Sequence, residues 1–214
     1  PAMSATKGRS GDPMFIATLI AEGLTAGQLS EAGDRLAAVG CAPGASRWID
    51  EGRAADLEFA MHPDAARAAL EGAFPACDAA VQPIAGREKK LLVADMDSTM
   101  ITVECIDELA DEVGIKAEVS AITAMAMNNE IAFEPALRQR VALLAGLDES
   151  VIERLVRDRI TLAAGARELV ATMNRDGAYT APVSGGFDAF TSRIAAKLGF
   201  REHRANRLLM ERGR

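Results

Sequence analysis

The chain has 214 residues, 49% of them hydrophobic and 26% charged, and a formal net charge of −7. That balance is typical of a globular protein, and the length allows one large domain or two smaller ones with separate cores. The charges are mixed along the chain without a long basic run, which argues against a nucleic-acid partner. No apolar stretch approaches the ~20 residues that span a bilayer, which argues against a membrane protein.

Residue types that bind soft metals are few. Cys41, Cys77 and Cys105 are odd in number and widely separated, which predicts neither a disulfide framework nor a thiolate metal site and indicates a reducing, cytoplasmic location. The two histidines, His62 and His203, are too few for a histidine-rich zinc site. Any metal is therefore expected to be held by oxygen ligands.

Residues 1–13 have no hydrophobic periodicity and no secretory signal, so we expect them to lie outside the folded domains. Residues 14–84 then alternate between the periods of strands and helices. The predicted order is strand-helix-strand-strand-helix-strand, with a strand from Met14, a helix capped by Thr25, strands at 46–49 and 55–61, a helix at 63–70 and a strand at 77–82.

This order over about 70 residues is typical of a ferredoxin-like α/β sandwich, a pattern also found in ligand-sensing domains of the ACT type. The segment carries no binding motif, and fold alone does not give function. Two interpretations are open for this ACT-like domain at 14–84: a packing or homodimerisation module, or a sensor of a small ligand. Residues 82–90, with Pro83, Gly86 and four charged side chains, have the composition of a linker.

Two acids follow the next predicted strand. The apolar run 90–94 leads directly into Asp95-Met96-Asp97-Ser98-Thr99. In open α/β sheets the carboxyl ends of strands form the ligand crevice, so Asp95 and Asp97 are expected at a binding site. Carboxylates two residues apart can both face one Mg²⁺, and an aspartate can also act as a nucleophile in phosphoryl transfer while its neighbour moves the proton.

This D-x-D-x-T pattern resembles the first motif of the haloacid dehalogenase-like phosphatases, and the spelling DMDST resembles their phosphoserine phosphatases. Glu104 follows nine residues after the first acid, and Phe133 precedes Arg140 by seven, as in that family. The segments VSGGF at 183–187 and ANRL at 205–208 resemble its later motifs. The resemblance covers residues 90–213 and implies a Rossmann-like phosphatase domain at 88–214 with a helical cap at about 101–164.

The resemblance also implies the role of each residue. Asp95 is expected to be the nucleophile and Asp97 the general acid and base, and both are expected to bind Mg²⁺, Asp97 through its backbone carbonyl. Ser184 and the amide of Gly185 are expected to hold the phosphate. Glu104 and Arg140 would bind the amino and carboxylate groups of serine, which suits an acceptor carboxylate and a bidentate guanidinium. Met127 and Phe133 are expected to shape the inner wall of the cap.

Each residue also has a structural explanation. Asp95 and Asp97 could form a solvated turn, and Glu104 lies among other acids that favour the start of a helix. Arg140 stands near Arg138 on a predicted helix whose outer face is solvated. The sequence 184–186 could be a plain turn between a strand ending at Val183 and a helix beginning near Asp188.

Compared with the family, the sequence ends at Arg214 before the later lysine and the acidic G-D-G-x-N-D motif. The phosphatase domain is therefore expected to be truncated, with weaker metal binding, an exposed sheet edge and exposed apolar faces. The predicted function is Mg²⁺-dependent hydrolysis of O-phosphoserine, the last step of serine biosynthesis. The alternative is an impaired homologue that retains only ligand binding or self-association through its first domain.

Overall fold

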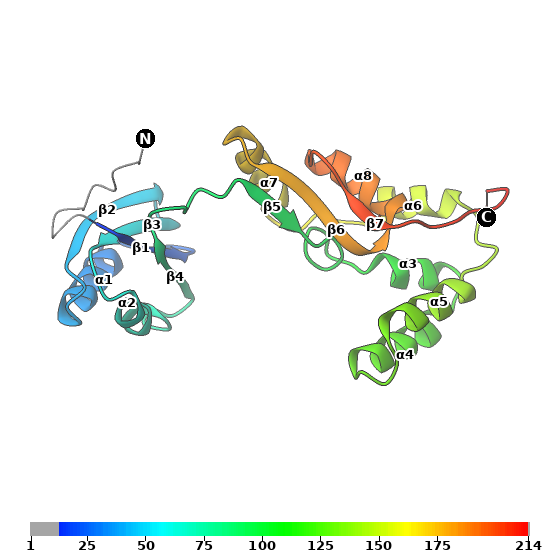
Figure 1. The fold of residues 1–214 in the computed structure, drawn as a ribbon, viewed down its shortest axis with the longest axis horizontal. Helices are drawn as coiled ribbons and strands as arrows, with labels where there is room; N and C mark the ends of the chain where they lie inside the picture. The colour runs from blue at the N-terminus through cyan, green and yellow to red at the C-terminus, as the bar shows by residue number, and fades with distance from the viewer. Residues whose placement is uncertain (1–12, 214) are drawn as a thin grey trace, which may run out of the picture. The chain divides into compact units, whose positions relative to one another are not determined.

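The computed structural model describes residues 13–213, and the chain divides into two compact units, Pro1–Glu88 and Lys89–Arg214 (Figure 1). Apart from Pro13, the N-terminal segment expected to lie outside the domains falls outside the described residues. Within the described part of the chain, no helix combines the length and the apolar character needed to cross a membrane.

The first unit has the element order predicted from the sequence. Within residues 13–88, four strands form one antiparallel sheet in the order β2-β3-β1-β4. Both helices lie on one side of this sheet (Figure 1). The elements are β1 Phe15–Ala21, α1 Ala26–Ala38, β2 Pro43–Asp50, β3 Ala54–Phe59, α2 Pro63–Leu70 and β4 Cys77–Pro83.

Alternation along the strands explains the core of this unit. Leu19 and Phe59 are fully buried and pack with Leu36 of α1 and Leu70 of α2. Helix α1 begins where the sequence predicts, because the Thr25 side chain accepts from the backbone amide of Gln28 and the Thr25 backbone amide donates to Gln28 Oε1.

The opposite face of the sheet carries a buried ion-pair cluster. The side chain of Asp56 has no exposed surface, and it accepts hydrogen bonds from Thr18 Oγ1 at 2.7 Å, Arg47 Nη2 at 3.1 Å and both terminal nitrogens of Arg87 at 2.6 and 2.7 Å. Burial alone raises the pKa of Asp56, but the hydrogen bonds and the charge of Arg87 outweigh it and leave the pKa below its usual value. Arg87 thereby fixes the segment after β4 onto the sheet.

As far as the structure describes it, the second unit combines a parallel sheet with six helices. The sheet order is β5-β6-β7, with both pairs parallel. The elements are β5 Leu91–Ala94, α3 Cys105–Glu112, α4 Lys116–Met127, α5 Phe133–Leu143, α6 Ser150–Asp158, α7 Ala166–Arg175, β6 Tyr179–Phe187, α8 Asp188–Leu198 and β7 Arg204–Asn206.

The two faces of this sheet differ in how far they are covered in the described residues. Ala94 packs in a core with Val170 of α7 and Phe190 of α8. On the other face Leu91 and Val93 are 59% and 56% exposed, so the predicted strand at 90–94 forms but is buried on one face only. Hydrophobic sequence identified the strand, but burial depends on which helices reach each face.

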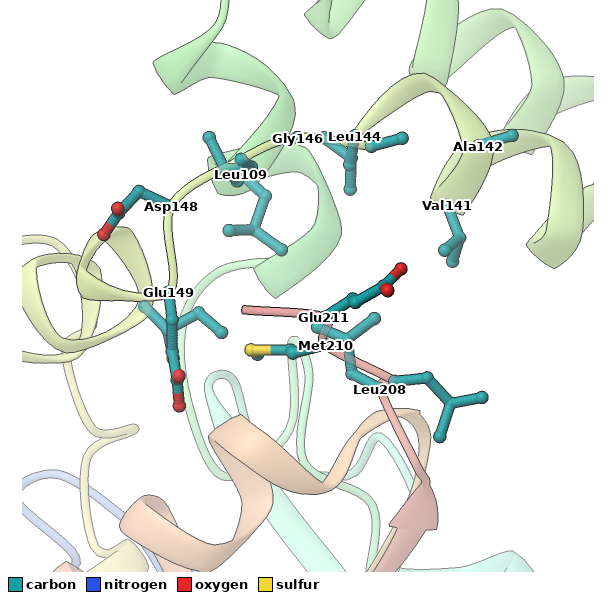
Figure 2. A pocket seen from close by; sticks show the side chains of 14 residues that line it. Leu109, Val141, Ala142, Leu144, Gly146, Asp148, Glu149, Leu208, Met210 and Glu211 are labelled. Atoms are coloured by element: carbon teal, nitrogen blue, oxygen red, sulfur yellow. The ribbon is translucent and has the colours of Figure 1, made fainter. Parts of the chain in front are cut away.

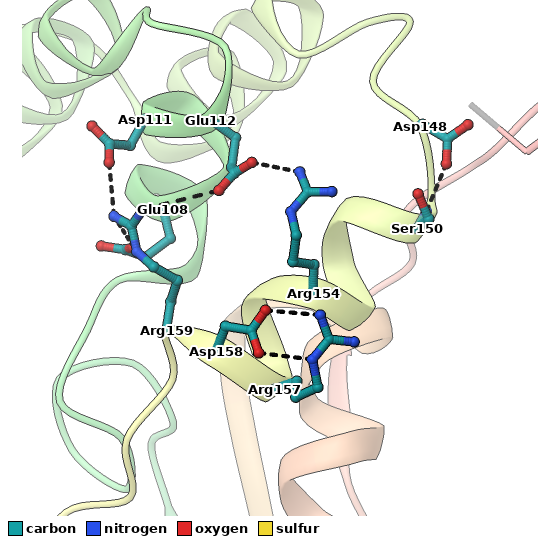
Figure 3. Close-up of polar contacts among 9 residues, drawn as sticks. All are labelled: Glu108, Asp111, Glu112, Asp148, Ser150, Arg154, Arg157, Asp158 and Arg159. Carbon is teal, nitrogen blue, oxygen red and sulfur yellow. Dashed lines mark hydrogen bonds and ion pairs between the residues drawn. The ribbon is translucent and has the colours of Figure 1, made fainter.

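Helices α3 and α6 are joined by ion pairs as well as by apolar packing (Figure 3). Arg159 contacts Glu108 at 2.6 Å and Asp111 at 2.7 Å, and Arg154 contacts Glu112 at 2.5 Å. The Glu108 side chain is only 10% exposed, so its bonds are less screened than those of a surface pair. This cluster holds the helix that begins beside the predicted site.

Candidate active site

One pocket of about 180 Å³ brings together the six residues predicted to form the site. They come from separate segments: the end of β5, the start of α3, the last part of α5 and the last part of β6. Eleven residues line the pocket: Asp95, Asp97, Glu104, Ile106, Phe133, Leu137, Arg140, Ser184, Gly185, Gly186 and Phe187.

The two acids after β5 have different environments. Asp95 is exposed, and its Oδ1 accepts from the backbone amide of Met96 at 2.8 Å. Asp97 is half-buried, and its Oδ1 accepts from the backbone amide of Cys105 at 3.1 Å. Burial raises the pKa of Asp97 above its usual value, and the charges of Glu104 and Asp95 add to that effect. The Asp95 carboxylate is thus exposed to solvent, whereas Asp97 is partly buried and holds its proton more tightly than a solvated aspartate would.

Cys105 is a buried apolar residue beside the site. Its side chain is 1% exposed, and burial together with the nearby Asp97 raises the pKa of the thiol. A thiol of this kind is a poor nucleophile, so its contribution is the backbone amide that fixes Asp97.

Glu104 and Arg140 place opposite charges in the same pocket. Glu104 precedes the first residue of α3, where it makes no side-chain bond to the helix, and its Oε1 accepts from Ser98 Oγ at 2.6 Å. Arg140 donates to Thr123 Oγ1 at 3.2 Å and to the Ala136 carbonyl at 3.4 Å. Neither forms an ion pair with any residue in the range 13–213. Both charges are therefore available to a ligand.

The segment 184–186 differs from the sequence prediction in its backbone. Strand β6 does not end at Val183 but continues to Phe187, with an irregular register against β7 between these two residues. Such bulges re-aim side chains beside functional sites. Ser184 Oγ accepts from the Gly186 amide at 2.9 Å, and the Gly185 carbonyl accepts from Asn206 Nδ2 at 2.7 Å.

The glycines of this segment permit close approaches. A Cβ on Gly186 would lie 2.9 Å from Asp97 Oδ2 and 3.1 Å from Ser184 Oγ. A Cβ on Gly185 would lie 3.3 Å from the ring of Phe133, the first residue of α5. Absence of these side chains lets the carboxylate and the ring lie against the β6 backbone. Met127, also predicted to shape the inner wall of the cap, is 80% exposed and does not line the pocket.

The oxygen donors at the end of β5 fit a hard divalent cation. Asp95 and Asp97 both line the pocket and offer two carboxylates. No group of three or more His, Cys, Asp or Glu side chains within the described residues could hold a metal ion. Mg²⁺ commonly takes one or two carboxylates and completes its coordination with water and substrate phosphate, so this donor set is compatible with it.

Three polar side chains at the site were missed by the sequence analysis: Ser98, Thr123 and Asn206. Ser98 bonds Glu104, Thr123 bonds Arg140, and Asn206 bonds the backbone of Gly185. Ser98 and Asn206 lie inside the sequence motifs that identify the site, and this position could have marked them as site residues. The only lysine after α5 in the sequence, Lys197, donates to the Val156 carbonyl at 2.8 Å and does not line the pocket.

A second cavity, of about 270 Å³, lies between α3, the segment joining α5 to α6 and the residues after β7 (Figure 2). Its walls are mostly apolar, with Leu109 and Leu144 facing Leu208 and Met210. Its charged lining residues, Asp148, Glu149 and Glu211, are all acidic. The polar pocket at the end of β5 is the better candidate for chemistry.

Comparison with known proteins identifies the family of the second unit. Residues 92–214, more than half of the chain, match the model of the haloacid dehalogenase-like hydrolase family. A phosphoserine phosphatase from Archaeoglobus fulgidus is 45% identical over 139 residues, which cover 64% of this chain and 40% of that protein. The chain spans 40% and 63% of the lengths of the first two curated relatives.

Solved structures give the same result. A phosphoserine phosphatase determined with an analogue of its phospho-aspartyl intermediate is 42% identical, with a TM-score of 0.54 over 58% of this chain and 59% of that one. A haloacid dehalogenase-family hydrolase from Salmonella enterica is 24% identical and has a TM-score of 0.75 over 94% of this chain and 70% of that one, which shows a shared fold across both units. The chain therefore belongs to the haloacid dehalogenase-like hydrolases, and many of its relatives are phosphoserine phosphatases.

Proposed function

We propose that this protein hydrolyses O-phosphoserine to serine and phosphate. The observation that carries the proposal is the pocket in which Glu104 and Arg140, free of ion pairs among the described residues, face the acids Asp95 and Asp97. An ammonium group and a carboxylate on one small substrate would neutralise this pair of charges. The names of the relatives support the same substrate.

The two ends of the substrate use different parts of the pocket. The guanidinium of Arg140 binds the substrate carboxylate, and the carboxylate of Glu104 accepts from its ammonium group. The phosphate binds at Ser184 and the amide of Gly185, where a small residue leaves room for it. Charge-assisted hydrogen bonds of this kind contribute about 1.5–3 kcal/mol each.

The reaction proceeds in two steps. A carboxylate oxygen of Asp95 attacks phosphorus, the bond from phosphorus to the seryl oxygen breaks, and Asp97 donates its proton to that oxygen. Water then attacks phosphorus of the aspartyl-phosphate while Asp97 accepts a proton from it, and the bond to Asp95 breaks. Serine and phosphate leave, and both carboxyl groups return to their starting states.

Mg²⁺ is the proposed cofactor, held by the Asp95 carboxylate and by Asp97 through its backbone carbonyl. When bound, the ion neutralises part of the negative charge on the phosphate. Asp97 then has a free carboxyl group for proton transfer, and its bond from the Cys105 amide keeps it oriented.

The organisation of the chain extends the proposal. We assign an ACT-like domain to residues 14–84, the phosphatase domain to 88–214 and the helical cap to about 101–164. A cytoplasmic location is supported by three cysteines that form no disulfide in the described residues. Homodimerisation through the first domain, and a place at the last step of serine biosynthesis, complete the proposed role. The alternative, an impaired homologue limited to ligand binding or self-association, is less favoured, because the residues of the proposed site meet in one pocket.

The test is phosphate release from O-phosphoserine, with and without Mg²⁺, by this chain and by its Asp95→Asn variant. Metal-dependent release that the variant lacks is the expected result, because the amide cannot act as nucleophile. Equal release by the two proteins would overturn the role of Asp95. Absence of release from a folded sample would overturn the activity itself.

A further inference from the structure

Ser98 has a backbone conformation that side chains rarely adopt. Its φ is 52°, in the left-handed region, where glycine is the usual residue. The conformation is imposed by a tight loop in which the Ser98 amide donates to the Val103 carbonyl at 3.2 Å and the Met100 amide donates to the Met96 carbonyl at 2.9 Å. A serine here bears a strain that glycine would avoid, so its side chain needs an explanation.

The hydroxyl of Ser98 supplies that explanation. Its Oγ donates to Glu104 Oε1 at 2.6 Å, a short bond to a carboxylate that lines the pocket. The side chain of Glu104 is otherwise unsupported by its own helix, because it makes no capping bond there. A glutamate side chain that is flexible in the free protein loses conformational entropy when it binds a ligand. A hydrogen bond that already fixes the carboxylate in the free protein lowers this entropy cost of binding.

We propose that Ser98 is a positioning residue that aims the Glu104 carboxylate at the ammonium group of the substrate. Its strained backbone is retained because the loop places the hydroxyl within reach of Glu104. Ser98 therefore contributes to selectivity for phosphate esters that carry an ammonium group over those that lack one. This inference rests on the proposed function, since it concerns the substrate of the same pocket.

Two variants separate this role from a structural one. Ser98→Gly removes the hydroxyl and relieves the strain, whereas Ser98→Ala removes the hydroxyl and keeps the strain. The readout is the ratio of kcat/KM for O-phosphoserine to kcat/KM for 3-phosphooxypropanoate, which lacks the amino group. We expect both variants to lower this ratio about tenfold, as the loss of one charge-assisted hydrogen bond would, and mainly through KM. Their Tm values should move in opposite directions.

A ratio unchanged in both variants would overturn the inference. So would a loss confined to Ser98→Ala, because the effect would then follow stability and not the hydroxyl. A Glu104→Gln background adds a second check: Ser98→Gly should lower the ratio much less there than in the parent, and fully additive effects would contradict the coupling.

Binding measurements on the same proteins distinguish failure of the inference from failure of the proposed function. Calorimetry with serine and with 3-hydroxypropanoate gives the same ratio without turnover. A parent that discriminates between them but releases no phosphate would contradict the hydrolysis, and the two Ser98 variants would still test the inference. A parent that neither releases phosphate nor discriminates would overturn both.

Discussion

The first unit neutralises its buried carboxylate, whereas the second leaves two opposite charges unpaired in a pocket. Asp56 has no exposed side-chain surface and accepts four hydrogen bonds, from Thr18, Arg47 and twice from Arg87. Glu104 and Arg140 are held only by neutral donors and acceptors among the residues that the structure describes. Charges in the first group have their partners inside the fold, and charges in the second do not.

Because of this difference, substitutions in the two groups should affect different properties, the stability of the fold in one and ligand binding in the other. Removing one member of a satisfied buried pair leaves the other charge without its partner and destabilises the fold. Removing a charge that has no partner costs the fold little, but it removes the attraction that a ligand would use. Substitutions of Asp56 should therefore lower the free energy of unfolding, and substitutions of Arg140 should lower substrate binding.

Asp56→Asn is expected to have the largest effect. The amide leaves the charge of Arg87 unbalanced beside a buried site, and the free energy of unfolding of the first unit should fall by about 3 kcal/mol. Urea unfolding followed by the fluorescence of Trp48, the only tryptophan, measures this unit. Asp78→Asn, at an exposed position on β4, is the control and should change the value by less than about 0.5 kcal/mol. Equal effects of the two substitutions would contradict the comparison.

Acid should weaken the same cluster. Because the pKa of Asp56 is lower in the folded state than in the unfolded state, its stabilising contribution is complete above the unfolded pKa of about 4. The contribution is lost as pH falls through the folded pKa. The difference in unfolding free energy between the parent and Asp56→Asn should therefore shrink below about pH 4, and a difference that stays constant there would contradict this assignment.

Arg140→Gln tests the unpaired side of the comparison. KM for O-phosphoserine should rise about 10–100-fold, because one charge-assisted contact to the substrate carboxylate is lost, while Tm changes little. Arg138→Gln is a matched control on the same helix, since Arg138 pairs with Glu134 at 2.8 Å with both side chains exposed. It should leave KM unchanged. A similar rise in both variants would show a general effect of charge and not a binding site.

Sequence alone predicted much of this molecule because its signals are local. Period-2 and helical patterns placed the elements of the first unit, and the capping residue Thr25 fixed the start of α1. The resemblance to the family's motifs implied six site residues, and the structure brings all six to one pocket. Their catalytic and binding roles stay predictions until activity is measured.

The remaining features depend on tertiary contacts. Leu91 and Val93 are exposed because α7 and α8 pack on the other face of the sheet. The sequence of the strand alone does not indicate which face the helices cover. Extension of β6 through two glycines requires pairing with β7, since small residues alone suggest a turn. The bond from Ser98 to Glu104 depends on the path of the loop between them.

Gly186→Ala should separate catalysis from binding within the pocket. The new Cβ would lie 2.9 Å from Asp97 Oδ2, so the carboxylate must leave the position fixed by the Cys105 amide. We expect kcat to fall about tenfold, because general acid-base catalysis depends on that position. Gly185→Ala meets the movable Phe133 ring instead and should affect KM more than kcat. If kcat and KM changed by the same factors in both variants, the two contacts would not have the separate roles in catalysis and binding that we expect.

Thr123→Val is expected to have the smallest effect and tests how an unpaired arginine is held. The hydroxyl of Thr123 accepts from Arg140 Nη1 at 3.2 Å, and it joins α4 to α5 without neutralising the charge. Its loss frees the guanidinium to sample other rotamers, so KM should rise about threefold while kcat is maintained. Ser120→Ala, at an exposed position on α4, is the control and should leave both constants unchanged. A larger effect of Thr123→Val than of Arg140→Gln would mean that the hydroxyl itself contacts the substrate. Substrate binding would then depend on this neutral group more than on the unpaired charge of Arg140.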